Sequence, residues 1–305
     1  MITTKLNKFL FESSEHFGKK IYSVRAICIY CIINIIMISP DMYEIFSSDG
    51  FVQKEINDKF IEWYQPRISW ITESLEFLNF SENTIILALF SLYLLSFIMV
   101  FFRYKPFAFS LVSWIGHLIL INSSYLFSYG ADYFISFLLF VNVMLNVSTI
   151  LNVKYDSMLY SFTIRFVQIH LCLVYFFAGF GKTLGTDWFD GNAIWFVINR
   201  FSPEFIGIAN VLAEYPLIYK VLSFAVLIEL LYPFLIFVLK IRNWMLSVIL
   251  LLHVCIALLM KFYMFGAIMI VLNLIAFGHY YSSSKLLKRI ESILPGKGRL
   301  VLDKE

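Results

Sequence analysis

The stretch TIILALFSLYLLSFIMVFF, residues 84–102, has no charged side chain and is long enough to cross a lipid bilayer as a helix. At a rise of ~1.5 Å per residue, about 20 apolar residues span the hydrocarbon core. Similar apolar runs occur along most of the chain. Together the runs fall at 24–40, 84–102, 107–127, 133–151, 158–180, 218–239, 244–260 and 262–280. The sequence therefore predicts an all-α, polytopic transmembrane bundle of about eight membrane helices.

The overall composition also indicates that lipid surrounds much of the chain. Of the 305 residues, 60% are hydrophobic and 15% are charged, whereas soluble domains are about half apolar and a quarter charged. A water-soluble core of this size cannot hide so much apolar surface, so the lipid bilayer is the expected surrounding. The net charge of +3 is small, and the sequence has neither a Gly-rich phosphate loop nor zinc-finger spacing. We therefore expect no nucleic-acid partner and assign no metal ligands.

The distribution of basic residues predicts the orientation in the membrane. Residues 1–20 are polar and lysine-containing, and the apolar run after them has no small-residue cleavage site, so we expect a signal anchor. Most of the 24 Lys and Arg residues share one side of the membrane if the N-terminus is inside. This rule predicts that both termini are cytoplasmic. Residues 1–280 then form the transmembrane domain, and residues 281–305 form a short basic tail at the inner surface.

Two predicted outer segments are long enough to contribute to function. Residues 41–83 carry nine acidic residues together with Trp63, Tyr64 and Trp70. This acidic 41–83 segment is either a partner-binding surface or a solvated loop, and composition alone slightly favours the loop. The second segment, 182–217, directly follows the fifth apolar run.

The run RFVQIHLCLVYFFAGFGK, residues 165–182, carries a polar stripe. Its polar and small residues recur at spacings of three and four, which places them on one helical face. These residues are Arg165, Gln168, Cys172, Tyr175, Gly179 and Lys182. In a spanning helix, such a stripe is expected to face the bundle interior or a water-filled cavity.

Lys182, at the end of this stripe, is the main candidate for chemistry. Removal from water disfavours a charged ammonium group, and a neutral amine can act as a base. The alternative is that Lys182 extends to the lipid headgroups at the end of a helix. The segment after it, TLGTDWFDGNAIWFVI, contains a Gly- and Asp-rich turn and a short apolar helix with Trp188 and Trp195. That helix is either a lid over a site or a plain interfacial helix.

Other ionisable side chains also fall within apolar runs. They are His117, Asp132, His170, Glu229, His253 and His279. Each of these side chains either forms a helix–helix hydrogen bond or belongs to a functional site. Glu229, four residues before Pro233, needs a partner because an unpaired carboxylate in a membrane is energetically costly. Cys28 and Cys31 form a C-x-x-C pair in the first apolar run, where packing is favoured over redox chemistry.

The run QIHLCLVYFFAGFGKTLGTDWFDG, residues 168–191, resembles the signature of the vitamin K-dependent carboxylase-like membrane domain, known as the HTTM domain. The family pattern is a Gln-led helix ending in Tyr-Phe-x-Ala-Gly-x-x-Lys, followed by Asp-Trp and a Gly. The matching residues here are Gln168, Tyr175, Phe176, Ala178, Gly179, Lys182, Asp187, Trp188 and Gly191. The surroundings of Glu229 and His253 resemble later family helices. The resemblance covers residues 20–280.

This resemblance implies a site and a cofactor. In the full carboxylases, the matching lysine is held to deprotonate a reduced quinone. By this resemblance Lys182 is the base, with His253 and Glu229 as catalytic neighbours. The resemblance implies that the cofactor is bound by Gln168, Tyr175, Gly179 and Trp188. The implied cofactor is a membrane quinone.

The compact bacterial branch that resembles the SdpB family is the closer match in size. It implies a multi-pass protein of the bacterial cytoplasmic membrane that acts in maturation of a secreted antimicrobial peptide. The implied partners are the small secreted peptide and an accessory maturation protein. One alternative is a non-enzymatic partner in peptide export or immunity. Another is a quinone-dependent γ-glutamyl carboxylase-like enzyme, although the large extramembrane domain of those enzymes has no counterpart in this sequence. A transporter is least favoured, because no inverted repeat is evident.

Overall fold

The computed structural model describes residues 20–151, 155–201 and 223–282, with isolated positions at 7, 9–11, 217 and 220. Within these residues every regular element is a helix, which confirms the all-α prediction. Six segments are long and apolar enough to cross a membrane: Lys20–Phe46, Glu82–Phe101, Pro106–Ser123, Gly130–Thr149, Asp156–Thr183 and Arg242–Met260. Two further apolar helices are shorter. The chain is thus a multi-pass membrane protein by helix length and composition, whereas eight crossings and cytoplasmic termini stay predictions.

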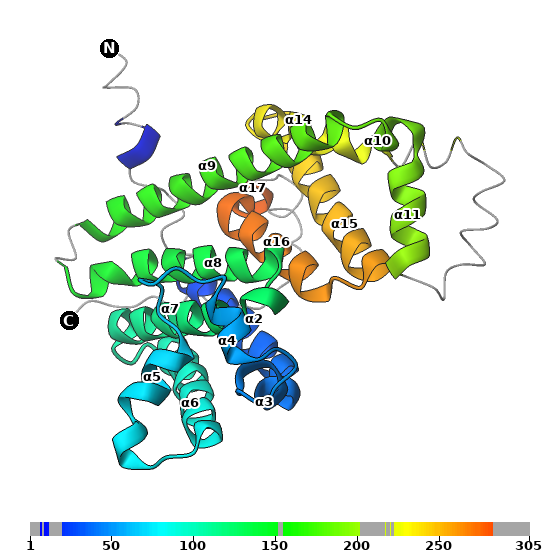
Figure 1. The fold of residues 1–305 in the computed structure, drawn as a ribbon. Helices are drawn as coiled ribbons and strands as arrows, with labels where there is room; N and C mark the ends of the chain where they lie inside the picture. The colour runs from blue at the N-terminus through cyan, green and yellow to red at the C-terminus, as the bar shows by residue number, and fades with distance from the viewer. Residues whose placement is uncertain are drawn as a thin grey trace, which may run out of the picture.

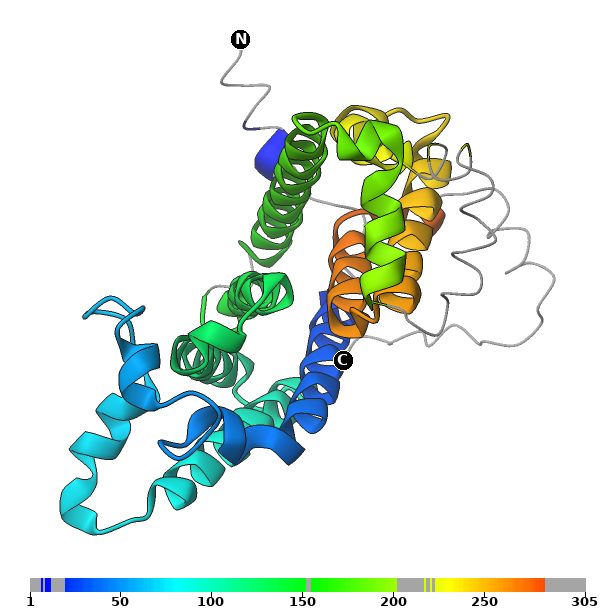
Figure 2. The same cartoon turned by 45° about the vertical axis from the view of Figure 1, so that its right-hand side comes forward.

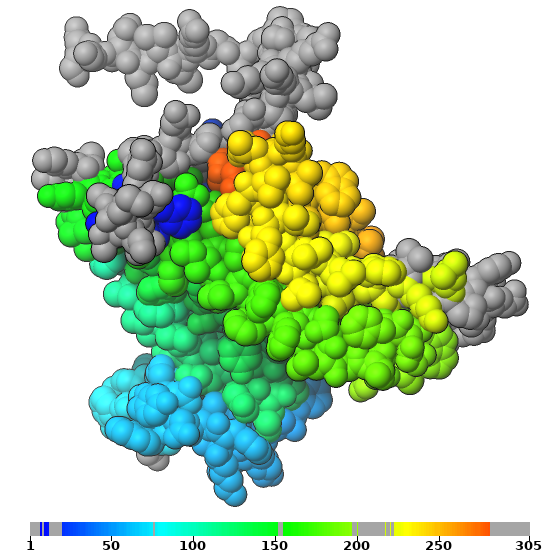
Figure 3. All heavy atoms as spheres, turned by 90° about the horizontal axis from the view of Figure 1, so that it is seen from above, coloured from blue at the N-terminus to red at the C-terminus, as the bar shows by residue number. Residues whose placement is uncertain are grey.

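The long helices pack as sequential neighbours. The first group is α2 (Lys20–Ile38), α6 (Glu82–Phe101), α7 (Pro106–Ser123) and α8 (Gly130–Asn146). The second group is α9 (Asp156–Thr183), α14 (Ala225–Leu235), α15 (Arg242–Met260) and α16 (Tyr263–Phe277). Helix α9 packs most extensively on α14 (Figures 1 and 3), and α15 packs on α16 (Figure 1). Helix α16 also contacts α2, α8 and α9, so it joins the two groups.

Each helix buries one face, and its exposed face is also apolar. On α6, Ile86 and Phe97 are fully buried, whereas Leu87 and Leu92 are nearly half exposed. Exposed leucines along a whole helix are unfavourable in water and are expected where the helix faces lipid tails. Local signals fix the helix starts: the Ser81 hydroxyl accepts a hydrogen bond from the Thr84 amide at the start of α6, and α7 begins at Pro106.

The acidic 41–83 segment is folded rather than a free loop. It contains α3 (Met42–Phe46), α4 (Lys54–Asp58) and α5 (Ile68–Ser74), with the short 3-10 helices η2 (Ser39–Asp41) and η3 (Glu76–Leu78). These elements gather around the start of α6 and the end of α7 (Figures 1 and 2). The Asn57 amide donates to the Asn122 carbonyl oxygen at 2.9 Å, and the Ile68 amide donates to the Ser123 hydroxyl at 2.8 Å. Sequence composition could not show these contacts, because their partners are some 55–65 residues away in the chain.

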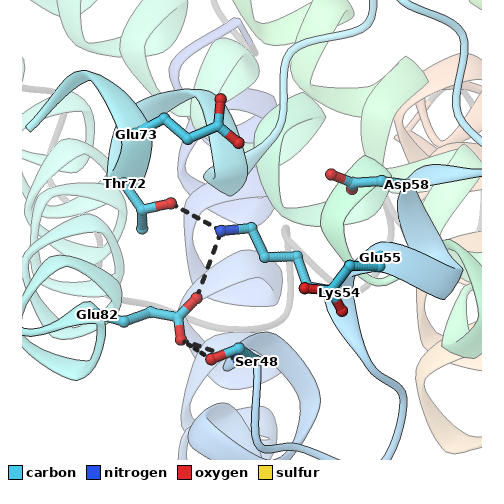
Figure 4. A pocket seen from close by; sticks show the side chains of 7 residues that line it. All are labelled: Ser48, Lys54, Glu55, Asp58, Thr72, Glu73 and Glu82. Atoms are coloured by element: carbon cyan, nitrogen blue, oxygen red, sulfur yellow. Dashed lines mark hydrogen bonds and ion pairs between the residues drawn. The ribbon is translucent and has the colours of Figure 1, made fainter. Parts of the chain in front are cut away.

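A polar pocket of about 390 Å³ lies within this segment (Figure 4). At its edge, the Lys54 ammonium donates to Thr72 Oγ1 at 2.8 Å and lies 3.7 Å from Glu82 Oε1. Glu55, Asp58 and Glu73 also line it. The residues that the structure describes contain no group of three or more His, Cys, Asp or Glu placed to hold a metal ion.

Gly179 sets the distance between α9 and α14. A Cβ atom on Gly179 would lie 2.7 Å from the Leu230 backbone nitrogen and 2.9 Å from its Cα, so only glycine permits this approach. Gly181, two residues further along α9, has nothing within 4 Å of the same position. The two glycines therefore form a matched pair for testing the helix contact.

We expect Gly179→Ala to lower the free energy of unfolding by about 1–3 kcal/mol, because the new methyl group overpacks the α9–α14 contact. Gly181→Ala is expected to be neutral or to stabilise the protein by up to about 1 kcal/mol, since alanine is the better helix former. Unfolding in mixed detergent micelles, followed by circular dichroism, measures both. Equal effects of the two substitutions would contradict the close approach at Gly179.

Candidate functional site

A cavity of about 620 Å³ lies among α9, α14, α15, α16 and the start of α8. Most of its wall is aliphatic or aromatic, as in typical small-molecule sites. A short turn helix, α10 (Asp187–Asp190), and α11 (Asn192–Phe201) complete the wall with Trp188 and Ile194. The polar and ionisable groups in the wall are Tyr129, Tyr175, Lys182, Glu229 and His253. An apolar cavity with a few convergent polar groups is the expected form of a binding site in a helical bundle.

Lys182 and Glu229 form an ion pair in the wall of this cavity. Lys182 lies in the last turn of α9, and its ammonium group donates to Glu229 Oε2 on α14. The Glu229 side chain is 7% exposed, whereas that of Lys182 is 30% exposed. A buried carboxylate is strongly unfavourable without a counter-charge, so Lys182 supplies the partner that Glu229 requires.

Trp188 lies beside the same ammonium group. The Lys182 Nζ atom is 5.0 Å from the centroid of the Trp188 ring, within cation–π range. Helix α11 packs against α15 (Figure 1), and Trp188 of α10 and Ile194 of α11 line the cavity. The short helix is therefore part of the cavity wall, and its role as a lid stays a prediction.

A buried hydrogen-bond network reaches the cavity at His253. Its Nε2 atom lies 2.7 Å from the Tyr175 hydroxyl oxygen, which in turn accepts from the Asn273 amide at 2.6 Å. The Tyr232 hydroxyl donates to Asn273 Oδ1 at 2.7 Å. All four side chains are at most 2% exposed. Among the described residues, the Nδ1 atom of His253 has no hydrogen-bond partner.

The structure brings most of the predicted site residues together. Tyr175, Lys182, Trp188, Glu229 and His253 all line the cavity. They come from segments 165–201 and 225–260, so their convergence depends on the packing of α9 against α14 and α14 against α15.

Two predicted residues lie elsewhere. Gly179 contacts α14 rather than the cavity. Gln168 shares the helical face of Lys182, but it is about 20 Å away along α9 at ~1.5 Å per residue. Its amide donates to the Ala276 carbonyl oxygen at 2.7 Å, and its oxygen accepts from Arg165. In this structure Gln168 therefore links α9 to α16 and does not reach the cavity.

The other buried ionisable groups make local contacts. His117 bonds Tyr93 Oη and the Asp132 carbonyl oxygen, and His170 stacks on Phe137 with ring centroids 3.7 Å apart. Cys28 and Cys31 are free thiols, fully buried in the core, as expected for packing.

Two residues of this network, Asn273 and Tyr232, were not predicted from the sequence. Asn273 is a lone amide in the apolar run 262–280, and Tyr232 lies three residues after Glu229 on the same helix. Either residue could have been predicted, because a polar side chain in a membrane helix, such as the Asn273 amide, requires hydrogen-bond partners.

The cavity therefore joins an acid–base pair to a fixed imidazole within an apolar wall. Such an arrangement can accept and return a proton at Lys182 and Glu229 while it shields an apolar molecule from water. No protein-family model, curated protein or solved structure matches the chain. The resemblance to the HTTM domain accordingly stays a prediction from the motif.

The ion pair gives a testable energetic signature. Breaking a buried ion pair lowers the free energy of unfolding by about 3–5 kcal/mol. Because Lys182 is partly exposed, we expect the loss in Lys182→Met to lie at or below the lower end of that range. The double variant Lys182→Met with Glu229→Leu should regain most of the loss, since no lone buried charge remains. A double-mutant cycle on unfolding in mixed micelles measures this. Additive effects of the two single substitutions would show that the groups are not coupled.

Proposed function

We propose that the protein is a membrane enzyme of the HTTM class that acts in maturation of a secreted antimicrobial peptide. On this proposal the protein lies in a bacterial cytoplasmic membrane with both termini inside. The cavity then lies toward the outer side, because α9 runs outward to Lys182. The peptide, presented with an accessory maturation protein, is processed there.

The observation that supports an enzyme is the convergence of Lys182, Glu229 and His253 in one apolar cavity. Structural helix–helix hydrogen bonds do not require an open volume of about 620 Å³ beside them. Catalytic acids and bases, by contrast, are commonly found in such clefts, next to the groups that adjust their charge state.

The ion pair suggests how a proton is handled. Lys182 can act as a base only when its amine is uncharged, and Glu229 is in position to take the proton from it. The pair then moves one proton between two contacting groups, without leaving a net charge in the apolar cavity. Trp188 stabilises the ammonium form through its cation–π contact.

The residues present fit the membrane quinone that the resemblance implies. A quinone is lipid-soluble, the wall is largely apolar, and Nδ1 of His253 is a buried polar atom that lacks a partner within the described chain. When bound in its reduced form, a quinone supplies an acidic hydroxyl. Tyr175, Trp188 and His253 would hold it, and Lys182, in the same wall, would accept the proton.

A non-enzymatic role in peptide export or immunity is the second candidate. The folded 41–83 segment favours it, because this segment carries a polar pocket lined by several carboxylates (Figure 4). Such a surface can bind a basic partner without any chemistry at Lys182.

Substitution of Lys182 in the natural host distinguishes the two functions. We expect Lys182→Arg, which keeps a cation beside Glu229, to reach a normal membrane level while the secreted peptide changes mass or disappears. Lys182→Ala, which leaves Glu229 unpaired, should change the peptide in the same way at a lower membrane level. Lys240→Ala is the matched control, because Lys240 is exposed in the turn between α14 and α15. Mass spectrometry of the secreted peptide and immunoblotting of the membrane fraction measure the outcome. Unchanged peptide in both Lys182 variants would reject the enzyme and leave the binding role.

A further inference from the structure

Two arginines lie near one tyrosine at a part of the bundle remote from Lys182. The Arg242 guanidinium, at the start of α15, lies over the Tyr280 ring, 4.2 Å from its centroid. Tyr280 belongs to α17 (His279–Ser282), a short helix that follows α16 and contacts α15. The second arginine, Arg165, precedes Lys182 by about 25 Å along α9 at ~1.5 Å per residue.

Hydrogen bonds hold Arg165 beside the end of α16. Its guanidinium donates to Gln168 Oε1 at 2.8 Å, and the Gln168 amide donates to the Ala276 carbonyl oxygen at 2.7 Å. Ala276 lies about one helical turn before Tyr280. The start of the polar stripe on α9 is thereby joined to the segment that carries Tyr280.

Both guanidinium groups lie close enough to Tyr280 to act on its hydroxyl group. Burial raises the pKa of Tyr280, whereas the positive charges of Arg165 and Arg242 act in the opposite direction. Tyr280 itself is 7% exposed, and both arginines are partly buried. Two like charges therefore converge on one region of the bundle, where they repel each other.

Neither arginine forms an ion pair with a carboxylate of the described residues. The carboxylates of α9 and α14 are already paired, Asp156 with Lys20 and Glu229 with Lys182. Partly buried charges without a counter-charge are energetically unfavourable. An anion bound between the two guanidinium groups would remove this cost. The planar guanidinium group matches phosphate in particular, because its donors can bind two oxygens at once.

The residues that flank Arg242 are typical of a membrane–water interface. Trp244 is 63% exposed and Leu239 is 76% exposed, and Lys240 beside them is exposed in the turn between α14 and α15. Tryptophan is enriched at the depth of the lipid headgroups, and an exposed leucine suits an acyl chain. An anion at this position is therefore expected to be part of a lipid rather than a free ion in solution.

We infer that Arg165 and Arg242 bind the phosphate headgroup of an anionic phospholipid at this end of the bundle. The site is separate from the cavity at Lys182, and the inference does not rest on the proposed function. Basic pockets between membrane helices on the cytoplasmic side bind such headgroups. A lipid at this position would hold α9 and α15 together at the end opposite to the cavity.

Native mass spectrometry of the whole protein in detergent, titrated with phosphatidylglycerol or phosphatidylcholine of the same acyl chains, tests the site. The first phosphatidylglycerol should bind about tenfold more tightly than the first phosphatidylcholine. Arg165→Gln and Arg242→Gln should each remove most of this preference. Arg25→Gln is the matched control, because Arg25 is exposed and also lies over an aromatic ring, 5.3 Å from the centroid of Phe101. It removes the same charge and should keep the preference.

The double variant Arg165→Lys with Arg242→Lys separates charge from fold. It keeps both positive charges, so it should retain part of the preference for phosphatidylglycerol. A preference lost as fully in this variant as in the Gln variants would show that the substitutions disturb the fold, and would overturn the inference. An equal loss in Arg25→Gln would also overturn it, since any surface charge would then suffice.

The source of the phosphate is tested by competition. Glycerol 3-phosphate, added at the concentration of the lipid, should leave the bound phosphatidylglycerol in place, because it lacks the acyl chains that contact the bundle. Displacement of the lipid would show that the two arginines bind soluble anions and would contradict a lipid site.

Discussion

An ionised carboxylate within a membrane bundle requires an opposite charge in contact with it, and Glu229 meets this requirement through Lys182. The contact ties the last turn of α9 to the middle of α14. It also determines the character of the cavity, because a neutralised pair leaves a polar but uncharged wall. The charge balance of the cavity and the proposed proton transfer both depend on this one ion pair.

The packing around the pair explains why it can form. Gly179 lets the backbone of α14 approach α9 closely, one turn before Lys182. Helix α16 then closes the other side through Asn273, whose amide joins Tyr175 of α9 to Tyr232 of α14. Lipid tails are as apolar as leucine, so close backbone contact and interhelical hydrogen bonds, rather than the hydrophobic effect, hold such helices together. The residues that build the bundle are therefore the same ones that orient the site.

The sequence predicted the helices well, because a long apolar run has few alternatives to a membrane or core helix. It also predicted that Tyr175, Gly179 and Lys182 share a face and that Glu229 needs a partner. The resemblance implied that Gln168 belongs to the site of Lys182, but their spacing corresponds to about 20 Å along α9, and Gln168 bonds α16 instead. The Asn273 network and the folded 41–83 segment depend on contacts between distant parts of the chain. No local pattern encodes such contacts.

Cross-linking with a lipid-soluble carbodiimide directly tests the contact between Glu229 and Lys182. The reagent activates a buried carboxylate, and an amine in contact with it attacks to form an amide while a urea leaves, so no spacer is introduced. We expect a Glu229–Lys182 isopeptide in the digested protein, absent in Lys182→Arg, as detected by mass spectrometry. Recovery of Glu229 only as an unlinked carbodiimide adduct, with Lys182 unmodified, would contradict the ion pair on which the cavity depends.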